Sequence, residues 1–220
     1  MTPDYESAAL RAAETLIKYG INSTPVVPIL ILKQLPDVLL VSFESLSNDM
    51  DQSRQCVMSM MGEKNQDAFT SVQTTPDGRK LYIVTYNQML PVFLEQRALA
   101  RELGHILLGH DGSRPEDVRQ EEAKAFAHHL LCPRPLIHAV QASGLRVTME
   151  VLNNLTGCND YCISCMRKIP ATHVPPEMNR KIRDAFMPYF VNFFNYQRVA
   201  THKDGSQKAD FGTYMDGYEE

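Results

Sequence analysis

The chain has 220 residues, of which 44% are hydrophobic, so it is long enough for one globular domain with an appendage. Its net charge of −4 lacks the basic balance that nucleic-acid binding requires, and we expect no direct contact with nucleic acid. No apolar run reaches the roughly 18 residues of a membrane span, and the first ten residues carry acids where a signal peptide has basic residues, so we expect a cytoplasmic protein without a membrane anchor.

The first segments have the pattern of a helix pair. Small and aliphatic residues recur at helical spacing over residues 5–19, and Gly20 is suited to end that helix. Pro28 is placed to open a second, short helix that ends before Pro36.

A small sheet is expected next. Apolar and β-branched residues predict strands at 38–44, 55–63, 68–74 and 80–87. The strand at 80–87 has the clearest pattern. Residues 45–54 are polar and are expected to form a loop, whereas the T-P-D-G stretch at 75–78 predicts a tight turn. We expect these strands to form a mainly antiparallel sheet.

Two helices follow, at 90–110 and 116–132. The first carries Glu102 and His105, three residues apart and therefore neighbours on one turn. It also carries Gly104, which costs about 1 kcal/mol relative to alanine inside a helix and so indicates close approach of another segment, for which the sheet backbone is the candidate.

The C-terminal part is expected to be helical from residue 136, with a break at Gly144. An aromatic, amphipathic tract at 176–196 is interrupted by Pro188; we prefer a helix docked on the domain, and the alternative is a partner surface. Residues 199–220 are polar and are expected to be a disordered tail. The predicted organisation is a domain at 1–170, an amphipathic extension at 171–198 and the tail at 199–220.

The helix at 90–110 differs by one residue from the zinc-binding pattern H-E-x-x-H. In that pattern two histidines four residues apart hold zinc, and the glutamate is the general base. Arg101 stands where the first histidine belongs, and it shares a helix face with His105. Arginine cannot bind zinc, because it stays protonated and has no free lone pair.

The runs A-R-E-L-G-H-I-L-L-G-H at 100–110 and E-E-A-K-A-F-A-H-H-L-L-C-P at 121–133 resemble the ImmA/IrrE family of metallo-endopeptidases. The resemblance extends more weakly over about residues 8–168. It implies an α+β fold with a minimal zincin-like domain, one zinc ion, Glu102 as catalytic base, and His105 and Glu122 as metal ligands. The A-x-x-F-A register favours Glu122 over the adjacent Glu121.

Arg101 leaves two alternatives for the metal. In one, His105 and Glu122 keep the zinc and another histidine fills the gap, with His129 as the first candidate and His110 and His128 as weaker ones. In the other, the site is metal-free, and Arg101 supplies the positive charge and pairs with Glu102 or Glu122.

The cysteines offer two weaker signals. Cys158, Cys162 and Cys165 form a C-x3-C-x2-C group that a structural metal could use, but no fourth ligand is evident and we favour reduced, buried thiols. A cysteine-protease site at Cys132 would rest only on the nearness of His128 in the sequence.

The resemblance also implies a function. Family members belong to phages and mobile elements and act on helix-turn-helix repressors, and an edge strand beside the site can receive a peptide by strand addition. We therefore expect a zinc-dependent endopeptidase that cleaves a repressor-like protein. The alternative is an inactive module of the same fold that binds such a partner without cleaving it, and Arg101 favours this alternative.

Overall fold

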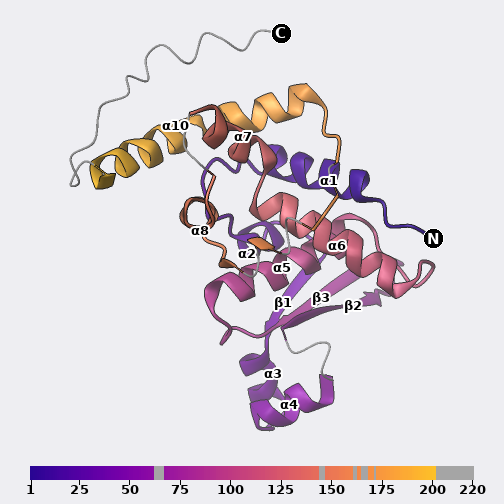
Figure 1. Ribbon diagram of the computed structural model, residues 1–220. Coiled ribbons are helices and arrows are strands. Elements are labelled where there is room, and N and C mark those ends of the chain that lie inside the picture. The colour runs from indigo at the N-terminus through magenta and orange to yellow at the C-terminus, as the bar shows by residue number, and fades with distance from the viewer. Residues whose placement is uncertain (62–66, 144–146, 161–162, 165–167, 171, 202–220) are drawn as a thin grey trace.

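A computed structural model of the chain describes residues 1–201 except 62–66, 144–146, 161–162, 165–167 and 171 (Figure 1). Three predictions therefore fall partly or wholly outside the described residues: the helix break at Gly144, the group that includes Cys162 and Cys165, and most of the tail.

The sheet has three strands in the order β1-β3-β2: β1 (Val38–Ser42), β2 (Ala68–Thr74) and β3 (Lys80–Tyr86). β2 pairs with β3 in antiparallel fashion through the predicted turn at 75–78, where Gly78 has a φ of 82°. β1 instead runs parallel to β3. The α+β class is confirmed, but the sheet is mixed rather than mainly antiparallel, and β2 forms one of its edges.

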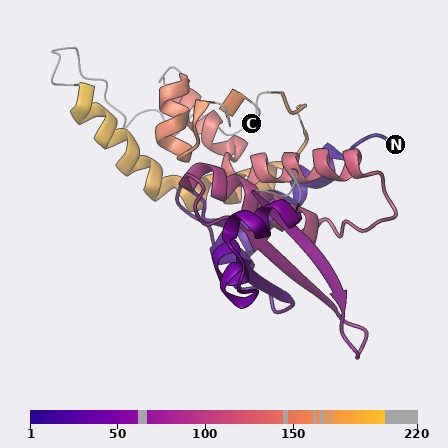
Figure 2. The same cartoon turned by 90° about the horizontal axis from the view of Figure 1, so that it is seen from below.

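The described residues between β1 and β2 are mainly helical. The predicted loop at 45–54 is therefore wrong, and so is the strand predicted at 55–63, of which 62–63 lie outside the described residues. α3 (Phe43–Asp49) begins where Ser42 Oγ accepts a hydrogen bond from the backbone of Ser45, and α4 (Arg54–Met61) follows. The glutamine and methionines of α4 are good helix formers, and this preference outweighs the weak alternation that suggested a strand. These two helices lie at one end of the sheet, away from α1 (Tyr5–Lys18) (Figures 1 and 2).

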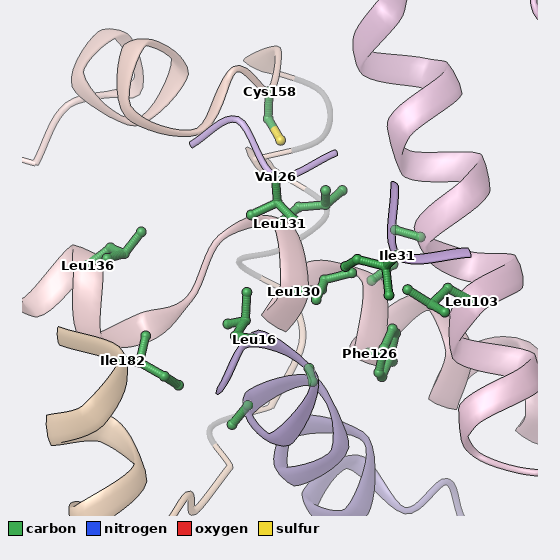
Figure 3. Packing of buried hydrophobic residues seen from close by; sticks show 14 of the residues in the cluster. Leu16, Val26, Ile31, Leu103, Phe126, Leu130, Leu131, Leu136, Cys158 and Ile182 are labelled. Carbon is green, nitrogen blue, oxygen red and sulfur yellow. The ribbon is translucent and has the colours of Figure 1, made fainter. Parts of the chain in front are cut away.

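The remaining helices gather on the other side of the sheet. They include α1 and the short α2 (Pro28–Leu32), both as predicted, and α5 (Val92–Leu107), α6 (Glu116–Leu131), α7 (Arg134–Ala142) and α8 (Met149–Thr156). The alanine face of α1 packs on α6, because small side chains let two helices approach closely. Figure 3 shows the core that results, in which Leu16, Ile31, Leu103 and Phe126 converge.

α10 (Pro176–Thr201) docks on this helical layer beside α1 and α7. Its side chains Ile182, Phe186 and Phe190 are buried in the core, which confirms a docked helix for the tract at 176–196. Pro188 does not interrupt the helix as predicted, since burial of a phenylalanine on either side offsets the cost of proline in a helix interior. No helix among the described residues is long and apolar enough to span a membrane.

Gly104 marks the closest approach of α5 to α6. A Cβ atom added there would lie 3.0 Å from Phe126 Cδ1 and 3.2 Å from the carbonyl oxygen of Ala123. The segment that requires this glycine is therefore α6. The sequence-based prediction, which named the sheet backbone, was wrong. The close contact matters because α5 and α6 carry the candidate site residues.

Gly104→Ala is expected to destabilise the protein by about 1–2 kcal/mol, because overpacking against the α6 backbone exceeds the gain in helix propensity. Urea denaturation measures this change. Gly112→Ala is the control, since nothing lies within 4 Å of its added Cβ. A Gly104→Ala protein as stable as the parent would contradict the tight contact.

Candidate functional site

A cleft of about 630 Å³ lies between the edge strand β2 and the helices α5 and α6. The strand contributes Phe69, Thr70 and Val72, and α5 contributes Arg101, Glu102 and His105. The other wall consists of His110 and residues of α6: Glu116, Asp117, Gln120 and Lys124. The predicted motif on α5 therefore does face a cavity.

Glu102 is only 3% exposed, and its carboxylate has partners on both oxygens. Oε1 accepts a hydrogen bond from Arg101 Nε at 3.0 Å and forms an ion pair with Nη2 at 2.9 Å, and Oε2 accepts a hydrogen bond from Thr70 Oγ1 at 2.9 Å. Arg101 Nη2 also donates to the carbonyl oxygen of Ala68 at 2.9 Å. Burial raises the pKa of Glu102, and the Arg101 charge and the Thr70 hydroxyl act against this rise.

A row of three side chains connects α5 to α6. His105 Nδ1 lies 2.8 Å from His110 Nδ1, and His110 Nε2 lies 3.0 Å from Glu122 Oε2. Burial lowers the pKa of both histidines, that of His105 to about 4, so both rings are neutral at pH 7. A neutral His110 that donates from Nε2 to the carboxylate must accept at Nδ1, so His105 donates from its own Nδ1.

Glu122 is the centre of the buried charge network. Arg114 pairs with it through both guanidinium branches, with Nη1 2.9 Å from Oε2 and Nη2 2.8 Å from Oε1. The backbone N–H of Asp4 donates to Oε1 at 2.7 Å, which ties the start of α1 to the site. With His110, four N–H groups point at this one carboxylate, and a two-branched arginine pair is among the strongest of such contacts.

The site thus compensates its own charges. Two carboxylates, Glu102 and Glu122, face two guanidinium groups, Arg101 and Arg114, and the two histidines between them are neutral. The adjacent exposed Glu121 pairs with Lys124 instead, so the register that favoured Glu122 over Glu121 agrees with the structure.

Arg114, Thr70 and Asp4 are site residues that the sequence did not indicate. Arg114 lies in the polar loop between α5 and α6, Thr70 on a strand and Asp4 before the first helix. No motif spacing links them to the helix at 90–110.

A resident zinc ion does not fit this arrangement. Both oxygens of Glu122 are occupied by N–H donors, and His105 and His110 are bonded to each other. Arg101 brings a positive charge to the place of the first ligand. Within the described part of the chain, no three His, Cys, Asp or Glu side chains are grouped so that they could hold a metal ion.

The structure separates His110 from the other two proposed substitute ligands, His128 and His129, which do not line the cleft. His110 lies between His105 and Glu122, whereas the Nε2 atom of His129 lies 3.1 Å from Thr172 Oγ1, outside the cleft. The preference for His129 was therefore wrong. His129 follows Glu122 by seven residues, so it returns to the same face of α6 but lies two turns further along the helix. Cys132 is buried, and burial raises its pKa to about 12, which leaves it an unreactive thiol at neutral pH.

Acid is expected to destabilise the fold below pH 6.5. Burial lowers the pKa values of His105, His128 and His129 to about 4, whereas the unfolded chain takes up these protons near pH 6.5. Stability is therefore complete above pH 6.5 and falls as the pH drops towards 4, which urea midpoints at successive pH values measure. His128→Leu removes one of these titrating imidazoles and should make stability depend less steeply on pH. An unchanged slope of stability against pH would contradict the lowered pKa of His128.

Comparison with known proteins gives one match. Residues 57–154 match the family model of peptidase family M78, described as the IrrE N-terminal-like domain. The match includes β2, β3, α5 and α6 and thus every cleft residue named above, with Asp4 outside it. No curated protein and no solved structure matches the chain. The resemblance inferred from the two motifs is therefore confirmed.

Proposed function

We propose that this chain, whose residues 57–154 match the IrrE N-terminal-like domain of peptidase family M78, binds an extended segment of a protein partner in its cleft without hydrolysing it. The observation that carries the proposal is the pairing of both site carboxylates with arginines. In this family of sites the glutamate acts as a base on a metal-bound water. Here Arg101 and Arg114 neutralise the two carboxylates whose negative charge would otherwise attract the metal.

The cleft offers a peptide a strand edge. β2 pairs with β3 on one side only, and Thr70 and Val72 line the cleft on the other. Val72 is 49% exposed and offers an apolar contact, whereas Glu116 and Asp117 outweigh Lys124 and give the opposite wall a net negative charge. A basic, partly apolar segment added to β2 fits both features. We propose a helix-turn-helix repressor of a phage or mobile element as the partner, since DNA-binding proteins carry such segments and the family resemblance implies this class.

A second candidate is a zinc-dependent endopeptidase, and the position of His110 favours it. Two imidazoles and a carboxylate are a common donor set for catalytic zinc, and His105, His110 and Glu122 lie in one row, although they are not grouped around a metal position as they stand. This function requires Arg114 to leave Glu122, after which Glu102 would serve as the base. Glu102→Gln would then abolish cleavage of the partner while preserving its binding.

Val72→Lys tests the binding proposal. Peptides are selected from a displayed random library on the parent protein, and we expect those that bind the cleft to lose about tenfold or more in affinity for the variant. Leu39→Lys is the control, because Leu39 is also 49% exposed but lies on the opposite edge strand, β1. Equal losses in both variants would contradict the proposal. Mass spectra of the peptides after prolonged incubation should show them intact, and a cleaved bond would establish the second candidate.

A further inference from the structure

A second cavity, of about 850 Å³, lies near the far end of α6 from the cleft. Its walls come from α1, α7, the segment at 172–174 and the first turns of α10, which lie together in Figure 1. It shares no lining residue with the cleft among the described residues, so it is a separate site. We call it the basic pocket.

The charged side chains that line the basic pocket are three arginines. Three arginines and three histidines line it, and none of its described lining residues is Asp or Glu: Arg134, Arg180, Arg183, His129, His138 and His173. This is a local concentration of positive charge on a chain whose net charge is −4. The three guanidinium groups repel one another unless an anion lies between them.

Contacts within the described structure use only part of the hydrogen-bonding capacity of these arginines. Arg134 Nη2 donates to the carbonyl oxygen of Pro170 at 3.1 Å, and Arg183 pairs at 3.2 Å with the exposed neighbour Asp184. Arg180 makes no ion pair with the described residues. Two of the three arginines therefore keep N–H donors for a ligand, and the third is wholly available in the described structure.

Helix orientation adds to the positive potential. α7 begins at Arg134 and α10 begins at Pro176, and the first turns of both helices line the pocket. The N-terminal end of a helix carries partial positive charge. Burial, together with the Arg134 charge, lowers the pKa of His129 to about 4, which agrees with a positive field at this place.

One wall of the basic pocket is apolar. α1 contributes Ala9, Ala13 and Leu16, and α10 contributes Ile182. We propose that the basic pocket binds a small phosphorylated molecule of nucleotide size. Its phosphates lie among Arg134, Arg180 and Arg183, and its organic part packs on this apolar wall. Arginine suits this ligand because its planar group matches phosphate oxygens in pairs.

Calorimetric titration of the full chain with ATP tests the proposal, with adenosine as the uncharged comparison. We expect ATP to bind with a dissociation constant in the micromolar range and adenosine to bind far more weakly. Arg180→Gln should weaken ATP binding by about tenfold or more, the usual effect of losing a charge-assisted hydrogen bond. Lys181→Gln removes the same charge one residue along α10, outside the pocket lining, and should change the affinity by less than about twofold.

Several results would overturn the proposal. They are no binding of ATP at millimolar concentration, equal losses in Arg180→Gln and Lys181→Gln, or tighter binding of a single-stranded oligonucleotide than of ATP. Arg101→Gln separates this site from the cleft, because ATP binding should survive that change. ATP binding that Arg101→Gln abolishes would locate the ligand in the cleft instead.

Discussion

Replacing Glu122 by glutamine is expected to lower the free energy of unfolding by about 2–4 kcal/mol. Glutamine keeps the shape of the side chain but removes the charge that pairs with Arg114, and its NH2 group meets other N–H donors. The side chain of Glu122 is only 3% exposed, so water cannot replace its partners, whereas Arg114 is 35% exposed and recovers part of its solvation. Urea denaturation measures the loss.

Glu121→Gln is the matched control, because this neighbour on α6 is 46% exposed and pairs only with Lys124. Its expected effect is within about 0.5 kcal/mol of the parent. A chelator should change neither value, since the network needs no metal. If a chelator destabilises the parent protein as much as the Glu122→Gln substitution does, the carboxylate holds a metal and our description of the network is wrong.

The double substitution Arg101→His with Arg114→Gln is expected to create zinc binding of about one ion per chain. The first change supplies the missing imidazole beside Glu102, and the second frees the Glu122 carboxylate. Together with His105 these groups complete the ligand set that the resemblance implies. Elemental analysis of the purified variant gives the zinc content.

The control is Arg101→Gln with Arg114→Gln, which removes the same two charges without adding an imidazole. It should bind far less zinc, because His105, His110 and Glu122 lie in a row and are not grouped around one metal position. A zinc-free Arg101→His, Arg114→Gln protein would mean that α5 and α6 do not present Glu122 to the face that carries His105, contrary to the geometry described above.

The elements that hold the site followed from local patterns. α5 has clear helical periodicity and begins after a proline, α6 lies between two prolines, and β2 and β3 flank a clear turn signal. α3 and α4 were missed because their polar and methionine-rich sequence has no clear period. The parallel pairing of β1 with β3 was missed too, since strand order depends on contacts between distant segments.

The site itself was only half predictable. Motif register placed Glu102, His105 and Glu122 near one another, and the replacement of a histidine by Arg101 raised a metal-free alternative. Arg101 pairs with Glu102 and not with Glu122. The sequence could not decide between the two acids, because the choice depends on the direction of the Arg101 side chain towards Ala68. Arg114 could not be foreseen, because the path of the loop that follows α5 decides which of its side chains turn back to α6.

The most direct test of a metal-free site is the zinc content of the parent protein, purified without chelator, incubated with excess zinc and dialysed. We predict less than about 0.1 zinc per chain, because Arg101 and Arg114 supply the positive charge and occupy the acids. About one zinc per chain that is lost in His105→Ala would contradict this, and it would establish a rearranged metal site.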